Sequence, residues 1–554
     1  MPSRRPAPKS PVKSAAPRPL VPPVRVFVTL ASLAAAMAMV RMGLLEPLVG
    51  GIVDAAVRNI ISLILAFSAL MAVLGWFLFQ SGHSAWLTRS VGLGLLAAVG
   101  LACAVFRVER VSGDLVPQLA FRWAPSRDRL LPQVAKPAAE VEVAAAWTPT
   151  LGDFSRFLGP QGSASLEGPI LDPSWESRPP EQLWRRPIGA GWGGFATCGD
   201  HAVTLEQRGD DEIVSCQSVA TGDVEWTVSV PARHETVLGG VGPRSTPTIA
   251  GGAVYTTGAT GWLHAIDGAS GRVLWKKNVL DDLGIDAAAH GLAVSWGRAG
   301  SPLVTESLVI VPGGGPRQDG SAVSLVAYDR ATGERRWTGG AEQISYVSPQ
   351  TASIGGREIV FTVNESSVAG YDPTDGTELW RFDWPGHSNS DATCSQAHVL
   401  DGGRIFVSKG YGVGAAAFEL KPGDPPTFAA VWRQPGLLKT KFTNVAIHDG
   451  HAYGLSDGIL ECVSLADGAR RWKGGRYGQG QVLRVGGLLL VQAESGEVVV
   501  VACLPEKPRV MGRFAAIDGQ TWNNLCLTGD RLLVRNAEEA ACYRLPLAAR
   551  GPAP

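Results

Sequence analysis

Five stretches of the chain repeat one eleven-residue pattern: CQSVATGDVEW (216–226), AIDGASGRVLW (265–275), AYDRATGERRW (327–337), GYDPTDGTELW (370–380) and CVSLADGARRW (462–472). Each copy has glycine at its seventh position and tryptophan at its last. A degenerate copy ends at Trp432, another ends at Phe514, and Trp184 has the tryptophan strand without a turn before it. The closing residues recur about every 40 to 60 positions, which is the length of four short strands with their turns.

The strands of one unit can be seen in residues 246–277. TPTIA, AVYTTG, WLHAID and RVLWKK read as four strands, and the repeated pattern supplies the turn between the last two. Asp267 can cap this turn through its side chain, and Gly271 can adopt positive φ. We expect the terminal tryptophan to pack over the turn of its own repeat and to fill the gap between neighbouring sheets. The expected docking residues are Trp184, Trp226, Trp275, Trp337, Trp380, Trp432 and Trp472, with Asp267, Asp329 and Asp372 in the turns.

The two ends of the repeat region complement each other. After Phe514 three strands remain, TWNNLCLTG, RLLVRN and AACYRLPL, whereas Trp184 has a fourth strand and lacks three. Joining them gives eight complete units in a closed ring, and closure removes the free strand edges that promote aggregation. The sequence therefore predicts an all-β, eight-bladed β-propeller of four-stranded blades over residues 181–548. The alternative is an open β-solenoid or a pair of sandwiches.

The pattern A-x-D-x-x-[ST]-G-x-x-x-W resembles the tryptophan-docking motif of PQQ-like β-propellers, part of the quinoprotein-like superfamily. Residues 265–275 and 327–337 match it at every fixed position, whereas Ser218 and Ser464 replace the aspartate in two other copies. That group includes quinoprotein alcohol and sugar dehydrogenases and the non-catalytic outer-membrane assembly protein BamB. The motif is specific for the fold and does not report function. A membrane anchor followed by such a propeller is similar to bacterial proteins described as BamB-like.

The N-terminal part of the chain has three apolar stretches. They cover residues 26–45, 59–79 and 90–106, against the roughly 20 residues that a membrane-crossing helix needs. We expect a membrane anchor of about three helices over residues 26–106, with Arg41 reaching the interface. A signal peptide in the first stretch is the alternative. Residues 107–180 carry many prolines and are predicted to be a stalk-like linker.

Charge predicts the orientation in the membrane. Residues 1–25 contain six Lys or Arg and no acid, which places this basic tail in the cytoplasm. Three crossings then put the propeller on the periplasmic side of the inner membrane. The whole chain of 554 residues has a net charge of zero, so the part after the tail is acidic. An acidic domain argues against nucleic-acid binding.

Catalytic and metal motifs are missing from the sequence. There is no C-x-x-C pair, no haem-attachment motif, no adjacent Cys pair of the quinoprotein type, no nucleophile motif and no P-loop. Cys216 and Cys462 occupy the first position of the repeat, where other copies have Ala or Gly. We therefore expect buried core thiols and no metal site.

One face of the predicted propeller gathers residues that dominate binding surfaces. The loops leading into the innermost strands supply Trp192, Arg244, Trp296, Tyr346, Lys441, Phe442, Arg476, Tyr477 and Trp522. The loops between second and third strands add Glu206, Asp210, Glu365, Asp457, Glu494 and Asn536 to the same face. We interpret this set as a platform for a ligand, or for a protein or peptide partner; the alternative is axial packing and turn chemistry.

Two functions follow from these observations. The first is a membrane-anchored, non-catalytic scaffold for envelope protein assembly that needs no cofactor. The second is a membrane-bound PQQ-dependent dehydrogenase of alcohols or sugars. That enzyme would need Ca²⁺ bound by carboxylate and amide oxygens, and Glu206, Glu365, Asn444 and Asn523 are the candidates. We favour the scaffold, because units of this length leave few long loops to cover a cofactor.

Overall fold

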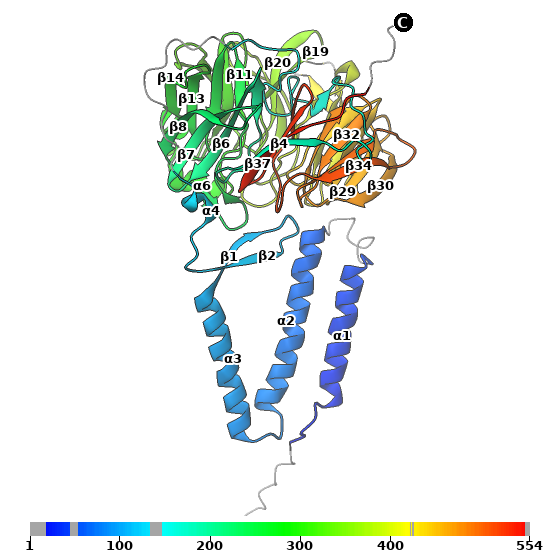
Figure 1. The fold of residues 1–554 in the computed structure, drawn as a ribbon. Helices are drawn as coiled ribbons and strands as arrows, with labels where there is room; N and C mark the ends of the chain where they lie inside the picture. Colours follow the sequence, from blue (N-terminus) through cyan, green and yellow to red (C-terminus); the bar gives the residue numbers. More distant parts are fainter. Residues whose placement is uncertain (1–17, 45–53, 133–146, 422, 424–425, 549–554) are drawn as a thin grey trace, which may run out of the picture. The chain divides into compact units, whose positions relative to one another are not determined.

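The repeated turns join the third and fourth strands of successive antiparallel sheets in the computed structural model (Figure 1). The structure describes residues 18–44, 54–132, 147–421, 423 and 426–548. These residues divide into two units, which we describe separately. One unit holds three long helices. The other is the propeller, to which Ala55 and Val108–Leu119 also belong.

The helical unit contains α1 (Val24–Arg41), α2 (Ala55–Phe79) and α3 (Ala85–Val105). All three are long and apolar enough to cross a membrane. The third helix begins earlier than its apolar run predicts, because the Ser84 hydroxyl accepts a hydrogen bond from the Leu87 N–H and caps the first turn. Arg41 lies at the end of α1, and its Nε donates to Ser62 Oγ of α2 at 3.1 Å.

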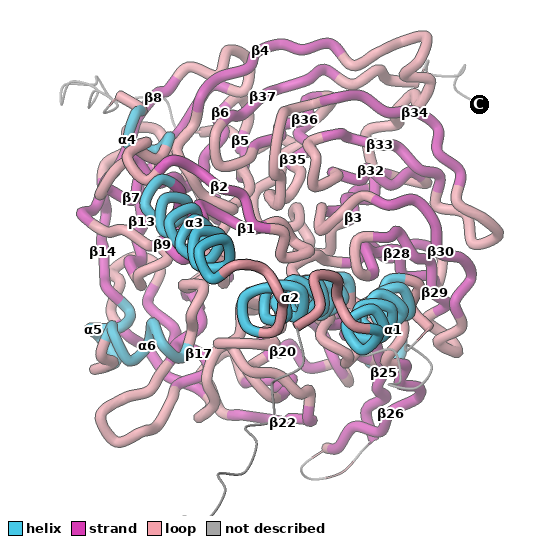
Figure 2. The backbone as a smooth tube through the Cα atoms, turned by 90° about the horizontal axis from the view of Figure 1, so that it is seen from below, coloured by secondary structure: helices cyan, strands magenta, loops and turns pink. Residues whose placement is uncertain are grey.

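The described residues of the propeller form eight blade sheets and a separate two-stranded sheet within residues 235–241. Figure 2 shows the blades arranged in a ring. The prediction of eight blades with four strands each is confirmed, except that one blade gains a fifth strand, β3. In order from the innermost strand outward, the first four blades are β5–β8 (Ala196–Cys198, His201–Arg208, Asp211–Ser218, Val224–Pro231), β11–β14 (Thr248–Ala250, Ala253–Thr257, Trp262–Asp267, Val273–Asn278), β15–β18 (Leu303–Val304, Leu308–Gly314, Val323–Asp329, Arg335–Gly339) and β19–β22 (Gln350–Ile354, Arg357–Val363, Ser367–Tyr371, Glu378–Asp383).

The other four blades continue the ring. They are β23–β26 (His398–Val399, Ile405–Lys409, Gly414–Lys421, Thr427–Gln434), β27–β30 (Val445–His448, His451–Ser456, Ile459–Ser464, Arg470–Arg476), β31–β34 (Gln481–Val485, Leu488–Gln492, Glu497–Ala502, Arg509–Ala515) and β35–β37 (Cys526–Thr528, Arg531–Arg535, Glu539–Arg544) completed by β4 (Glu181–Pro187). The last blade thus takes its outermost strand from the start of the repeat region, with Cys542 opposite Trp184. The ring closes as the two incomplete ends predict.

The docking tryptophans connect neighbouring blades. The indole Nε1 of Trp275 donates to the Arg330 carbonyl at 3.0 Å, in the turn of the next blade rather than its own. Trp184, Trp226, Trp337, Trp432 and Trp472 donate in the same way, to Val219, Gly268, Pro373, Leu465 and Leu504. The expectation of packing over the same repeat's turn is therefore wrong, because the outermost strand faces the neighbouring sheet.

The repeat glycine is explained by the same contact. Gly333 has a positive φ of +72°, and a Cβ there would lie 2.7 Å from the Trp275 ring. Gly222, Gly271, Gly376 and Gly468 face the preceding blade's tryptophan equally closely. Both positive φ and the approach of the indole exclude a side chain. Glycine and tryptophan of the motif are thus partners across a blade boundary.

The turn aspartates keep the expected local role. Asp267 Oδ1 accepts from the Ser270 N–H at 2.9 Å, Asp329 Oδ1 from Ala331 and Thr332, and Asp372 Oδ1 from Thr374.

The apolar core lies between adjacent sheets. One buried cluster, for example, joins Val203 and Trp226 of one blade to Ile249 and Val254 of the next.

From Trp147 onward the expected linker is part of the propeller, whereas residues 133–146 of it lie outside the described residues. Phe154, Leu171 and Trp175 are buried in its core, and β3 (Ser165–Leu166) pairs in parallel with β31. A stalk over all of residues 107–180 is therefore wrong. The apolar side chains responsible are scattered among prolines and glycines, which hides any period that would predict packing. The remaining described elements are β1 (Phe106–Val111), β2 (Pro117–Phe121), α4 (Arg127–Leu130), β9 (Glu235–Thr236), β10 (Gly240–Val241), α5 (Val279–Leu283), α6 (Ala287–Ala293) and the 3₁₀ turn Asp401–Gly403.

Candidate functional site

The predicted platform residues separate into two aromatic groups. The Trp522 ring lies between those of Trp192 and Phe442, with 4.7 Å between ring centroids on each side. Trp296 and Tyr346 form the second group, with centroids 5.6 Å apart and the Trp296 N–H donating to the Tyr346 hydroxyl at 3.1 Å. Loops from different blades therefore bring these side chains together.

Arg244 binds the protein's own backbone. Its guanidinium donates to the carbonyls of Gly239 and Gly242, both at 2.6 Å, and Trp192 Nε1 donates to the same Gly239 carbonyl at 2.7 Å. Burial lowers the pKa of Arg244 to about 10, although nearby Tyr346, Cys394 and Glu212 oppose the shift. Arg244 thus stabilises the loop of residues 239–242 and is not available to bind a partner.

A turn of the same chain occupies part of the platform. The turn lies within residues 108–119, which the contact pattern assigns to the propeller unit, and we call residues 111–114 the tip. The Gly113 N–H donates to Glu494 Oε1 at 2.7 Å, and Gln520 Nε2 donates to the Val111 carbonyl at 2.9 Å. Glu494 Oε1 also accepts from Trp522 Nε1 at 3.0 Å, so one carboxylate connects the tip to the aromatic group.

Close packing requires glycine in the tip. A Cβ on Gly113 would lie 2.2 Å from Cγ of Gln479, whose own N–H donates to Glu494 Oε2 at 2.9 Å. Arg110 strengthens the attachment through an ion pair with Glu538 at 3.0 Å. The tip is therefore fitted to this surface.

Lys441 contributes positive charge to this region. Its Nζ lies 3.1 Å from Asp54, 3.9 Å from Asp457 and 3.5 Å from the Gly113 carbonyl, and the side chain is buried. Asp457 also accepts from the Ala55 N–H at 2.9 Å. Burial raises the pKa of Asp114, with Lys441 acting in the opposite direction. The platform thus contacts peptide groups with one ammonium and two carboxylates.

A groove remains open beside the tip. Arg476, Tyr477, Glu494 and Glu497 line it from the blades, and Ser112 and Gln118 line it from the turn of residues 108–119. Its volume is about 450 Å³. Arg476 is exposed, whereas Tyr477 is buried. The groove is large enough for a few residues of another peptide.

The other predicted carboxylates and amides serve the fold. Asp210 is exposed and paired with Arg129 at 2.8 Å, and Asn536 Oδ1 accepts from the N–H groups of Glu538 and Glu539. Sequence reasoning missed the tip, because residues 107–180 read as a linker. It also missed two buried cations, Lys409 and Arg535. The Lys409 ammonium donates to the Pro385 carbonyl, and the Arg535 guanidinium donates to the carbonyls of Leu205 and Gly189.

The four candidate Ca²⁺ ligands do not fit a shared ion. Glu206 binds the Gly189 N–H and Arg208, and Glu365 accepts from the Ser388 N–H at 2.8 Å. Asn444 Oδ1 accepts from the Gln396 N–H. Asn523 Nδ2 donates to the carbonyls of Gly191 and Gly193, whereas its Oδ1 has no hydrogen-bond partner among the described residues. Among the described residues no two of the four share a hydrogen-bond partner. The fully buried Arg535 beside Glu206 further disfavours a second cation there.

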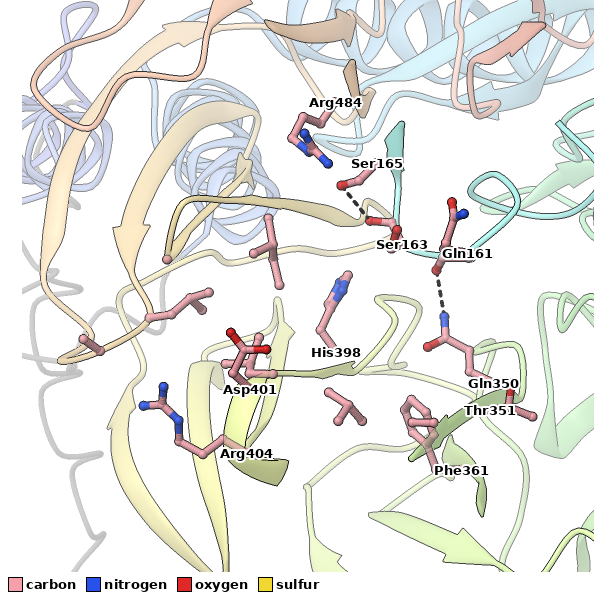
Figure 3. A pocket seen from close by; sticks show the side chains of 18 residues that line it. Gln161, Ser163, Ser165, Gln350, Thr351, Phe361, His398, Asp401, Arg404 and Arg484 are labelled. Carbon is pink, nitrogen blue, oxygen red and sulfur yellow. Dashed lines mark hydrogen bonds between the residues drawn. The ribbon is translucent and has the colours of Figure 1, made fainter. Parts of the chain in front are cut away.

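A second cavity, of about 490 Å³, lies between the chain at residues 161–165 and four blades (Figure 3). Its lining includes Gln350, His398, Arg404 and Arg484, and the His398 imidazole stands near the middle of the group in Figure 3. Burial lowers the pKa of His398 to about 4, so the ring is neutral at pH 7. The cavity involves none of the predicted platform residues.

Comparison with known proteins gives one family and two kinds of relative. Residues 181–474 match the family model described as outer membrane protein assembly factor BamB. A curated protein, quinohemoprotein alcohol dehydrogenase ADH-IIG of Pseudomonas putida, is 30% identical over 157 residues, or 26% of this chain. The matched region is only 19% of that enzyme's length.

Solved structures share the fold. Quinohemoprotein alcohol dehydrogenase from Comamonas testosteroni aligns with a TM-score of 0.51 and 13% identity, over 74% of this chain and 83% of the enzyme. BamB from Moraxella catarrhalis aligns with a TM-score of 0.47 and 15% identity, over 66% of this chain and all of BamB. At these identities the likeness concerns architecture alone.

Proposed function

The chain belongs to the family described as outer membrane protein assembly factor BamB, and from this membership we propose that it is a non-catalytic binding module, anchored in the inner membrane with its propeller in the periplasm. Its proposed task is to hold protein segments during envelope protein assembly. The observation that carries this proposal is the tip: residues of the platform already bind a peptide turn of the same chain.

The tip also indicates what kind of partner the platform accepts. A backbone N–H is bound by the Glu494 carboxylate, and a backbone carbonyl faces the Lys441 ammonium. These contacts do not depend on a particular side chain, and Trp522 and Phe442 add apolar surface beside them. A protein segment lying in the groove next to the tip could use Arg476 and Glu497 in the same manner.

Site-specific photo-crosslinking in living cells tests the binding role. A photoreactive residue at Ser495, which is exposed in the groove, should crosslink to discrete envelope proteins. The same residue at Glu358, which is exposed and lies outside the groove, is the matched control. Crosslinks of equal yield at both positions, or none at Ser495, would contradict a partner site in the groove.

A reporter fusion tests the proposed orientation. The proposed orientation rests on the basic tail of residues 1–25 and on three helices that are long and apolar enough to cross a membrane; it would put the C-terminus in the periplasm. Alkaline phosphatase is active only in the periplasm, so a copy fused after Pro554 should be active. Activity of a reporter that folds only in the cytoplasm would instead show that the C-terminus lies in the cytoplasm and would contradict the proposed orientation.

A dehydrogenase is the second candidate, because the curated relative at 30% identity is a quinohemoprotein alcohol dehydrogenase. The engaged oxygens of Glu206, Glu365 and Asn444 support the binding role instead. Adding PQQ and Ca²⁺ to the purified full-length protein separates the two. Bound-cofactor absorbance with alcohol-dependent dye reduction would establish the enzyme and overturn the non-catalytic role.

A further inference from the structure

Three side chains with metal-binding atoms meet on the outer part of the blade β5–β8. They are His201 at the start of β6, Cys216 in β7 and Glu225 in β8. One ligand atom of each lies within 4.8 Å of the other two. Glu225 Oε2 is 2.7 Å from His201 Nδ1 and accepts from the Cys216 thiol at 3.3 Å.

A β-bulge produces this meeting. Cys216 pairs with Trp226, whereas the next residue, Gln217, pairs with Val224, so Glu225 is the extra residue on β8. A bulge changes the direction of the unpaired side chain, and here it brings a carboxylate beside the thiol. The Trp147 ring stacks on the His201 ring, with centroids 4.6 Å apart and planes 10° from parallel, which fixes the orientation of the imidazole.

We propose that His201, Cys216 and Glu225 form a Zn²⁺ site with a solvent-facing fourth position. One nitrogen, one sulfur and one oxygen are a ligand set that suits Zn²⁺, whereas Ca²⁺ and Mg²⁺ prefer oxygen alone. Tetrahedral Zn²⁺ holds its ligand atoms roughly 3.5 Å apart. The three side chains would therefore have to move by about 1 Å to bring their ligand atoms to this spacing. The thiol proton is released to solvent on binding.

Exposure of the three residues fits an open metal position. The His201 and Glu225 side chains are 33% and 32% exposed, whereas Cys216 is fully buried beneath them. A Zn²⁺ ion held between them would reach solvent on one side and the thiolate on the other. Three protein ligands and one open position are the usual arrangement of zinc sites that bind a further ligand.

The blade β27–β30 offers an internal comparison. His451 and Cys462 occupy the same register as His201 and Cys216, opposite Ser464 and Trp472. The residue before Trp472 is Arg471, where β8 has Glu225. The repeat therefore does not need a carboxylate at this position for folding, and within the described residues the complete set of three ligands is found in the blade β5–β8.

Cobalt substitution tests the proposal on the full-length protein in detergent. After removal of metal by a chelator, Co²⁺ should bind with one equivalent per chain at this site and produce a thiolate-to-cobalt charge-transfer band with the visible bands of four-coordinate Co²⁺. Cys216→Ser should abolish the charge-transfer band, and His201→Ala should lower Co²⁺ affinity roughly tenfold or more. Cys462→Ser is the matched control and should leave the band unchanged.

Glu225→Arg keeps the test decisive if loss of Cys216 impairs folding. It copies the arrangement of the blade β27–β30, so the variant should unfold at the wild-type temperature in the presence of chelator. Zn²⁺ should raise the unfolding temperature of the wild type and not that of Glu225→Arg. No charge-transfer band in the wild type, or a band that survives both Cys216→Ser and Glu225→Arg, would overturn the site and leave His201 and Glu225 as a simple ion pair.

Discussion

Trp184 and Cys542 lie opposite each other in one antiparallel strand pair, although they stand at opposite ends of the propeller sequence. The pair closes the ring, because β4 completes the sheet that β35–β37 begin. Closure covers the edge of β37, and an uncovered edge is prone to pair with other chains. The first and last strands therefore hold the whole circle together.

A designed disulfide should report this closure. Glu181 and Arg544 are directly opposed and form an exposed ion pair, so cysteines at both positions should oxidise to a disulfide. The bond should raise the unfolding temperature, because it closes a long loop in the unfolded chain. After one proteolytic cut between the two positions, the fragments should stay joined until a reductant is added. Each single cysteine variant is the control, and joined fragments in a single variant would contradict the assignment.

Blade docking should respond strongly to the glycine–tryptophan contact. Trp275→Ala should destabilise the protein by about 3–5 kcal/mol, because the ring is buried between blades and donates to Arg330. Gly333→Ala should also destabilise it strongly, through a clash with the same ring and a positive φ. Asp267→Ala should cost about 1 kcal/mol, since it removes a turn hydrogen bond only. Chemical unfolding measures all three; near-equal small effects would contradict docking.

Gly113→Ala should release the tip from the platform. The added Cβ would collide with Gln479, and the hydrogen bond to Glu494 would be lost. Trypsin should then cleave after Arg110 faster than in the wild type. Val116→Ala is the matched control, because Val116 is exposed on the same turn. Equal cleavage rates in both variants would show that the tip is not held by the contacts of Gly113.

Stability should fall as pH rises through the titration of Glu212. Burial raises the pKa of this carboxyl from 4.5 to about 7, although the Ala259 N–H and Arg244 oppose the shift. The folded protein therefore binds more protons than the unfolded chain between these values, so the contribution is complete below 4.5 and is lost as pH rises through about 7. Glu212→Gln should lack this loss, and its unfolding temperature relative to wild type should increase from pH 5 to pH 8. Glu358→Gln, at an exposed position, should show no such trend.

The propeller, the number of blades and the three apolar helices can all be predicted from the sequence. Repetition is what made this possible: five copies of one turn and strand report the same local chemistry, and the incomplete ends at Trp184 and residues 541–547 reveal closure without any distant contact being known. The gathering of Trp192, Phe442 and Trp522 also followed, since blade order alone places those loops on one face.

Which partners those residues meet follows from the packing of the blades and is not visible in the sequence. The motif tryptophan docks on the next blade's glycine, Glu494 binds Gly113, and His201 meets Cys216 and Glu225 across three strands. Residues 147–175 join the core for the same reason, because scattered apolar side chains such as Phe154 and Trp175 have no period to read. A repeat encodes strand and turn locally, whereas contacts between blades depend on the twist and stacking of whole sheets.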